Sequence, residues 1–167
     1  MQRPSQYKSH NMSLDNFAKI FNNEPYYPNI IIKPIEEETY RDDGLIYEVN
    51  TQKSIGFDWE IRDRYFSNGN FYLPTLRQFE RKVIKPEIDL SIQCDSTETA
   101  IVVAWHEDFK SGNSFVQESK TDYIYKETAI VRETSYFRVY TYEQVVEFKA
   151  MLHQAFTNNQ YNHNSFK

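Results

Sequence analysis

Three residues in the middle of the chain have the types and spacing that phosphate chemistry requires: Asp58, Glu80 and Lys82. We expect a β-hairpin here, with Asp58 on a first arm over 56–66 and a turn at 67–70. Glu80 and Lys82 would lie at the end of the second arm. Because side chains alternate faces along a strand, these two residues would share one face. If Asp58 lies at the same edge, two carboxylates and one amine converge.

Such a convergence would suit a divalent metal ion. Two carboxylates can hold a hard cation such as Mg²⁺ or Mn²⁺, because these ions prefer oxygen ligands. The metal can polarise a phosphate and lower the pKa of a bound water. Lys82 can place that water or stabilise the negative charge that develops on the phosphate. These residue types therefore predict hydrolysis of a phosphodiester bond.

The order of Asp58, a hairpin and Glu80-Arg81-Lys82 resembles the PD-(D/E)XK superfamily of metal-dependent nucleases, which have a restriction-endonuclease-like fold. The lead-in over 50–57 is also similar to that of phage and mobile-element members. The resemblance implies a DNA endonuclease in which Asp58 and Glu80 hold Mg²⁺ or Mn²⁺ and Lys82 activates water. It also implies a homodimer or higher homo-oligomer, because cutting both strands needs two sites.

A further metal ligand is expected ahead of Asp58. Pro34 suits the first turn of a short helix over 35–41, which would carry Glu36, Glu37 and Glu38. The resemblance implies that a glutamate from such a helix joins the metal site, and Glu37 is our candidate. The alternative is that these acids only complement the helix dipole.

Basic residues gather around the same hairpin, although the chain as a whole is acidic with a net charge of −5. The window 77–85 holds four cations and one acid, and two arginines lie on the first arm. This pattern predicts a stripe that contacts DNA phosphates. The alternative is a charged edge strand protected against aggregation. The expected nucleic-acid-binding residues are Arg62, Arg64, Arg77, Arg81 and Lys85.

Residues 57–62 alternate strictly, with apolar side chains at odd positions and polar ones at even positions, and Arg64 and Tyr65 continue the pattern. Asp58 and Glu60 share the polar face, which is either the floor of a cleft or a solvated face with weak ion pairs. In a second possible register, Gln93-Cys94-Asp95 forms the second motif and an acid replaces the lysine. The site would then be degenerate, and the protein would bind without cutting.

The composition favours one folded domain. The chain has 167 residues, 40% of them hydrophobic and 16% aromatic, which is enough for a core. We expect the α+β class, with a mixed, mostly antiparallel sheet flanked by helices. Thr141 and Gln144 form a capping box that begins the last helix. The domain would span 13–156, between a flexible segment at 1–12 and a disordered polar tail at 157–167.

The sequence also predicts a compartment and leaves two hypotheses of function. One cysteine, Cys94, and no secretory signal indicate an intracellular, cytoplasmic protein, and the resemblance to phage members implies an infected bacterial host. No apolar run is long enough for a bilayer. The first hypothesis is the nuclease. The second is a non-catalytic acidic binding protein, an inhibitor or adaptor with a protein partner, on the same fold. They differ in whether Asp58 and Glu80 can share one metal beside Lys82.

Overall fold

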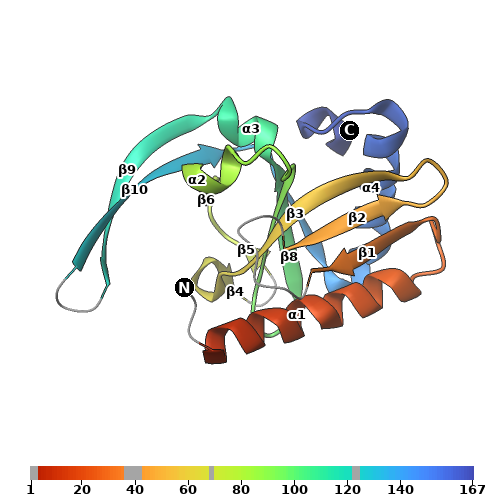
Figure 1. Ribbon diagram of the computed structural model, residues 1–167, viewed down its shortest axis with the longest axis horizontal. Helices are drawn as coiled ribbons and strands as arrows, with labels where there is room; N and C mark the ends of the chain where they lie inside the picture. Colours follow the sequence, from red (N-terminus) through yellow and green to blue (C-terminus); the bar gives the residue numbers. More distant parts are fainter. Residues whose placement is uncertain (1–3, 36–42, 68–69, 122–124) are drawn as a thin grey trace.

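The computed structural model describes residues 4–35, 43–67, 70–121 and 125–167. Its centre is a six-stranded sheet in the order β1-β2-β3-β7-β8-β11. Neighbouring strands are antiparallel except for β3 and β7, which are parallel. With helices on its faces, the protein belongs to the expected α+β class (Figure 1). The strands are β1 (Ile30–Pro34), β2 (Gly44–Glu48), β3 (Lys53–Ile61), β7 (Leu90–Cys94), β8 (Ala100–Trp105) and β11 (Arg138–Thr141).

Two helices, α1 (Pro4–Asn23) and α4 (Val145–Asn158), cover one face of this sheet. Phe17 of α1 packs against Trp59 of β3 and Phe148 of α4, with ring centroids 5.2 and 6.2 Å apart. This layer is the main hydrophobic core, because burying large aromatic side chains contributes most to stability. No helix in the described part of the chain is both long and apolar enough to cross a membrane.

A smaller layer covers the opposite face. It consists of a three-stranded sheet in the order β6-β10-β9 and two short helices. Its apolar contact with β8 is a compact cluster of Leu76, Val83, Val102, Ala104 and Phe109. Figure 1 shows β9 and β10 running out from the body as a long curved arm. The elements are β6 (Leu76–Phe79), α2 (Glu80–Val83), α3 (His106–Lys110), β9 (Asn113–Thr121) and β10 (Tyr125–Thr134).

The alternation of β3 determines which side chains enter which layer. Phe57 and Trp59 point into the aromatic core, as the odd positions predict. Asp58 and Glu60 point to the other face, and they are buried there beneath the second layer. The polar face of β3 is therefore not a solvated surface.

The expected hairpin over 56–82 does not form. The first arm ends at Ile61, where the 3-10 helix η1 (Asp63–Tyr65) interrupts it. Pro74 interrupts the second arm, because proline cannot donate a ladder hydrogen bond. Only two-residue strands, β4 (Phe66–Ser67) and β5 (Asn70–Phe71), pair around the predicted turn. β3 pairs with β2 and β7 instead, and β6 pairs with β10.

Both ends of the chain are more structured than the sequence suggested. α1 begins at Pro4, inside the segment 1–12 that we expected to be flexible, and proline suits a first helical turn. The expected capping box is present, with the Thr141 amide donating to Gln144 Oε1 at 3.0 Å. Residues after α4 fold back and end in the 3-10 helix η4 (His163–Phe166), so the expectation of a disordered tail was wrong.

The tail is held against β8 and α3. Trp105 Nε1 donates to Ser165 Oγ at 2.8 Å, and the ring of Tyr161 lies 5.7 Å from that of Trp105. His163 Nδ1 lies 2.7 Å from Asp108 Oδ1. A buried indole N–H needs a hydrogen-bond partner, and the tail provides it.

Deleting residues 160–167 should therefore destabilise the whole domain. The loss of the Ser165 hydrogen bond and of the packing on Trp105 should lower the free energy of unfolding by about 2–4 kcal/mol. Urea unfolding followed by tryptophan fluorescence measures this change. Removal of Lys167 alone, which is exposed, is the control. An unchanged midpoint for the longer deletion would mean that the tail does not pack.

Candidate functional site

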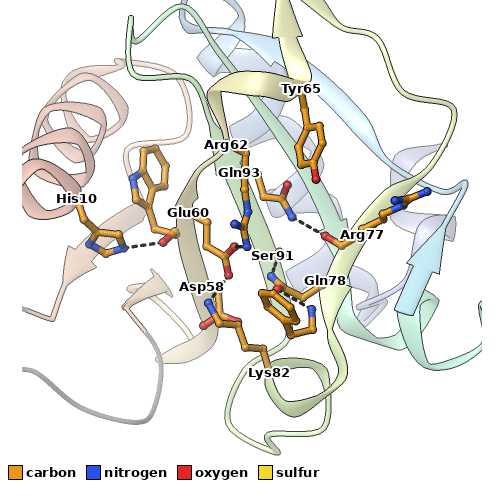
Figure 2. A network of polar contacts seen from close by, with 12 residues as sticks. His10, Asp58, Glu60, Arg62, Tyr65, Arg77, Gln78, Lys82, Ser91 and Gln93 are labelled. Carbon is orange, nitrogen blue, oxygen red and sulfur yellow. Dashed lines mark hydrogen bonds and ion pairs between the residues drawn. The ribbon is translucent and has the colours of Figure 1, made fainter. Parts of the chain in front are cut away.

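The polar face of β3 continues across β7. The parallel pairing places Ser91 beside Asp58 and Gln93 beside Glu60, so four polar side chains form a row on one face of the sheet. All four are buried. Figure 2 shows this row with the side chains that reach it from the covering layer. Because buried polar groups need partners, these contacts decide how the second layer is attached.

The segment from β6 to α2 supplies most of those partners. Gln78 Nε2 donates to Ser91 Oγ at 2.8 Å, and Gln93 Nε2 donates to the Arg77 carbonyl at 2.8 Å. Lys82 Nζ donates to Glu60 Oε1. These contacts tie β6 and α2 to the central sheet through hydrogen bonds rather than through apolar packing alone.

Glu60 is ionised between two cations. Arg62 Nη2 contacts one carboxylate oxygen and Lys82 Nζ contacts the other. Burial alone would raise the pKa of Glu60, but the charges of Lys82 and Arg62 outweigh it and hold the pKa below its usual value. Both oxygens of this carboxylate are therefore already engaged by the protein's own cations.

Asp58 has a different environment. Its Oδ2 is buried without a hydrogen-bond partner among the described residues, and His106 Nε2 lies 3.8 Å away, beyond hydrogen-bond length. Burial raises the pKa of Asp58 to about 7, although the charge of Lys82 opposes this shift. Burial and the nearby Lys110 lower the pKa of His106 to about 4. At neutral pH the imidazole is therefore neutral.

A second histidine, His10 of α1, lies at the other side of β3. Its Nε2 is 2.6 Å from the Trp59 carbonyl oxygen and 3.6 Å from Asp43 Oδ2. Asp43 also accepts a hydrogen bond from the Trp59 amide at 2.8 Å. Burial would lower the pKa of His10, but Asp43 raises it overall. These contacts fasten α1 to β3 (Figure 2).

The structure does not assemble the predicted trio of Asp58, Glu80 and Lys82. Glu80 and Lys82 lie on helix α2 rather than on a strand, and residues two apart on a helix point to different sides. Glu80 Oε1 accepts from Arg132 Nε at 3.1 Å and Nη2 at 2.8 Å, whereas Lys82 reaches Glu60. Glu60, not Glu80, is the carboxylate that accompanies Asp58. The expected ligand Glu37 lies outside the described residues.

The carboxylate oxygens expected to bind magnesium have other partners in this structure. A hard cation would have to displace Lys82 and Arg62 from Glu60, and it would lie beneath the second layer. Within the described ranges, no three His, Cys, Asp or Glu side chains are placed to hold a metal ion. In the second register, Gln93 lies beside Glu60, while Asp95 accepts hydrogen bonds from the Thr99 and Ala100 amides.

A pocket lies next to the buried row. Three of the five predicted nucleic-acid-binding residues, Arg62, Arg64 and Arg77, line it, and no acidic residue does. Arg81 and Lys85 lie outside the lining. The arginines come from the segment after β3 and from β6, and the arm adds two side chains. The lining consists of Arg62, Arg64, Tyr65, Arg77, Gln78, Phe79, Gln117 and Val131.

Two of the pocket arginines are held by aromatic rings and remain exposed to solvent. Arg64 stacks on Tyr65 at 4.9 Å from the ring centroid and donates to its hydroxyl at 2.8 Å. Arg77 stacks on Phe115 at 5.0 Å, and its Nε lies 3.8 Å from Glu133. The Arg77 side chain is 47% exposed. An aromatic ring orders a guanidinium without neutralising it, and the contact of Arg77 with Glu133 is long and partly exposed to solvent. Both arginines can therefore attract an anion.

Several pocket residues could not be found from the sequence. Tyr65 and Phe79 belong to the region that we expected to be a hairpin, where they read as ordinary strand aromatics. Gln117 and Val131 come from the arm, and no spacing rule connects them to Arg64. The one available signal was the cluster of arginines around 62–81.

Comparison with known proteins identified no relative: no family model, no curated protein and no solved structure matches this chain.

Replacing Asp58 by asparagine should remove a pH dependence of stability. A raised pKa means that the folded state holds the proton more tightly than the unfolded state. Wild-type stability from this group is thus complete below about pH 4 and is lost as the pH rises through about 7. The shift from 3.8 to about 7 corresponds to about 4 kcal/mol. Asp58→Asn should be more stable than wild type at pH 8.

Urea unfolding at pH 5 and pH 8 tests this, with Asp15→Asn as the control because Asp15 lies on α1, away from the buried row. The advantage of Asp58→Asn should shrink as the pH falls. An equal difference at both pH values would show that Asp58 does not titrate in this range.

Replacing Lys82 by methionine should destabilise the protein, because it leaves buried Glu60 with Arg62 alone. The expected loss is about 3 kcal/mol at neutral pH, as for other broken buried ion pairs. Glu60 has a lowered pKa, so the loss should diminish as the pH falls into the acid range and the carboxyl takes a proton. Lys19→Met, on an exposed position of α1, is the control. If Lys82→Met costs as much in a Glu60→Gln background, the pairing is not the cause.

Proposed function

We propose that this protein binds nucleic acid without cutting it, and that the pocket around Arg62, Arg64 and Arg77 holds the backbone phosphates. The observation that carries the proposal is the lining itself. Three arginines line the pocket and no acidic residue does, in a chain whose net charge is −5. Arg62 pairs with Glu60 and Arg77 with Glu133, but both acids lie outside the lining. A local concentration of cations in an acidic protein is most simply explained by an anionic ligand.

The chemistry of the arginines favours phosphate as the anion. A guanidinium offers several donors in a fixed plane and matches phosphate oxygens in pairs. Arg64 and Arg77 are already ordered by Tyr65 and Phe115, so less side-chain entropy is lost on binding. Arg62 contributes charge from the floor, where Glu60 holds it.

The contacts of the buried row favour binding over hydrolysis. Glu60 is engaged by two cations of the same chain, and Glu80 is engaged by Arg132. A phosphodiester would also have to reach Asp58 through the layer of β6 and α2. We assign these groups a structural role, which is to hold the elements that line the pocket.

We also infer an intracellular, cytoplasmic location. Cys94 is the only cysteine, and it is a buried free thiol. An unpaired cysteine of this kind is typical of proteins in reducing compartments.

The double substitution Arg64→Ala/Arg77→Ala should weaken binding to a short fluorescein-labelled DNA strand at least about tenfold, because each charge-assisted hydrogen bond contributes about 1.5–3 kcal/mol. The dependence of affinity on salt should become shallower, by about 0.7 in logarithmic slope for each phosphate of a single strand that the variant no longer binds. Fluorescence polarisation over a salt series measures both quantities.

Arg138→Ala is the matched control, because Arg138 is also exposed and stacks on an aromatic ring, Phe166, outside the pocket. It should leave affinity and salt slope nearly unchanged. Equal effects of both variants would rule out the pocket. DNA cleavage that requires Mg²⁺ and is lost in Asp58→Ala would contradict the non-cutting assignment.

A further inference from the structure

We infer, resting on the proposed function, that the pocket accepts an unpaired nucleotide, so that the protein selects single-stranded nucleic acid, and that Gln117 contacts the edge of the base. Three features of the pocket carry this inference: its stacks of arginine on aromatic rings, the unequal use of its two glutamine amides, and its position between the arm and the body.

The first feature is the density of stacked groups. In the described part of the chain, four of the five arginine–aromatic stacks lie in or beside the pocket. They join Arg62 and Arg81 to Phe79, Arg64 to Tyr65, and Arg77 to Phe115. Phosphates alone would need charge but no rings. Bases, in contrast, stack on both aromatic side chains and guanidinium planes.

The second feature is a difference between the two glutamines. Both ends of the Gln78 amide are used inside the protein: Nε2 donates to Ser91 and Oε1 accepts from the Phe79 amide at 3.0 Å. The Gln117 amide makes no hydrogen bond within the described ranges, and its residue is half-buried in the lining. An amide has two donors and an acceptor, and it can pair with a base edge.

The third feature is where these groups lie. Arg64 and Tyr65 follow β3 in the body, whereas Gln117 lies on β9 of the arm, which Figure 1 shows projecting from the body. Gln117 is paired with Ala129 across the arm, and Phe115 with Val131, so Gln117 and Phe115 share the face that bears Val131. A nucleotide in the pocket would have its phosphate toward Arg64 and Arg77 and its base toward Gln117.

This arrangement discriminates against a duplex. In a double helix the base faces are stacked on one another and the pairing edges are occupied, so only the phosphates could reach the pocket. A single strand can turn a base out at little cost. The affinity for a single strand should therefore exceed the affinity for a ligand that has the same phosphates but no accessible bases.

The test compares wild-type binding to four labelled ligands of equal length by fluorescence polarisation: a DNA strand, its duplex, an abasic strand with the same phosphates, and an RNA strand of the same sequence. We expect the DNA or RNA strand, or both, to bind about tenfold more tightly than the abasic strand and the duplex. The RNA strand separates the two possible sources of the ligand.

Gln117→Leu should lower the affinity for the base-containing strand about fivefold or more. The affinity for the abasic strand should not change, because the amide contacts only the base. Gln154→Leu, the same change on α4, should have no effect. If all four ligands bind alike and only the arginine variant weakens them, this inference is overturned while phosphate binding stands. If none of them binds, both proposals fail.

Discussion

Glu60 is a carboxylate held in the protein interior, and the chain supplies two cations that keep it ionised there. Removing either cation would leave this buried carboxylate with a single ionic partner, which destabilises the protein, so the positions of Lys82 and Arg62 are constrained. Lys82 fixes helix α2 over the sheet. Arg62 fixes the point at which the chain leaves β3. The second layer is thus attached at a polar contact, and its apolar cluster is small.

The same constraint organises the pocket beside it. Arg62 belongs to both: one side of the guanidinium contacts Glu60 and the other reaches the lining. Gln78 likewise uses its amide to bind Ser91 and thereby holds Phe79 in place. The buried row fixes the floor of the pocket, while Arg64 and Arg77 at its rim remain exposed. A binding site requires both features: side chains that are held rigidly in place, and charged groups that are exposed to the ligand.

The sequence predicted the fold class, the last helix and the two faces of β3, because these depend on periodicity that neighbouring residues carry. It did not predict the partner of Lys82. A spacing of two places residues on one face of a strand but on different sides of a helix, and Glu80-Arg81-Lys82 is compatible with both. It also missed Gln117, since contacts between distant strands leave no local pattern. The arginines Arg64 and Arg77 were found because their charge is itself the signal.

The pocket is expected to form late in folding, because its lining joins segments that are far apart in the chain. Arg62, Arg64 and Tyr65 of the lining come from the segment after β3, whereas Gln117 comes from β9, which belongs to the other sheet and lies much later in the chain. Contacts between such distant segments close large loops, which is slow compared with forming a helix or a local hairpin. The pocket can be complete only when both sheets have formed and docked. Only the fully folded protein would therefore bind the ligand, and a partly folded chain would not compete for it.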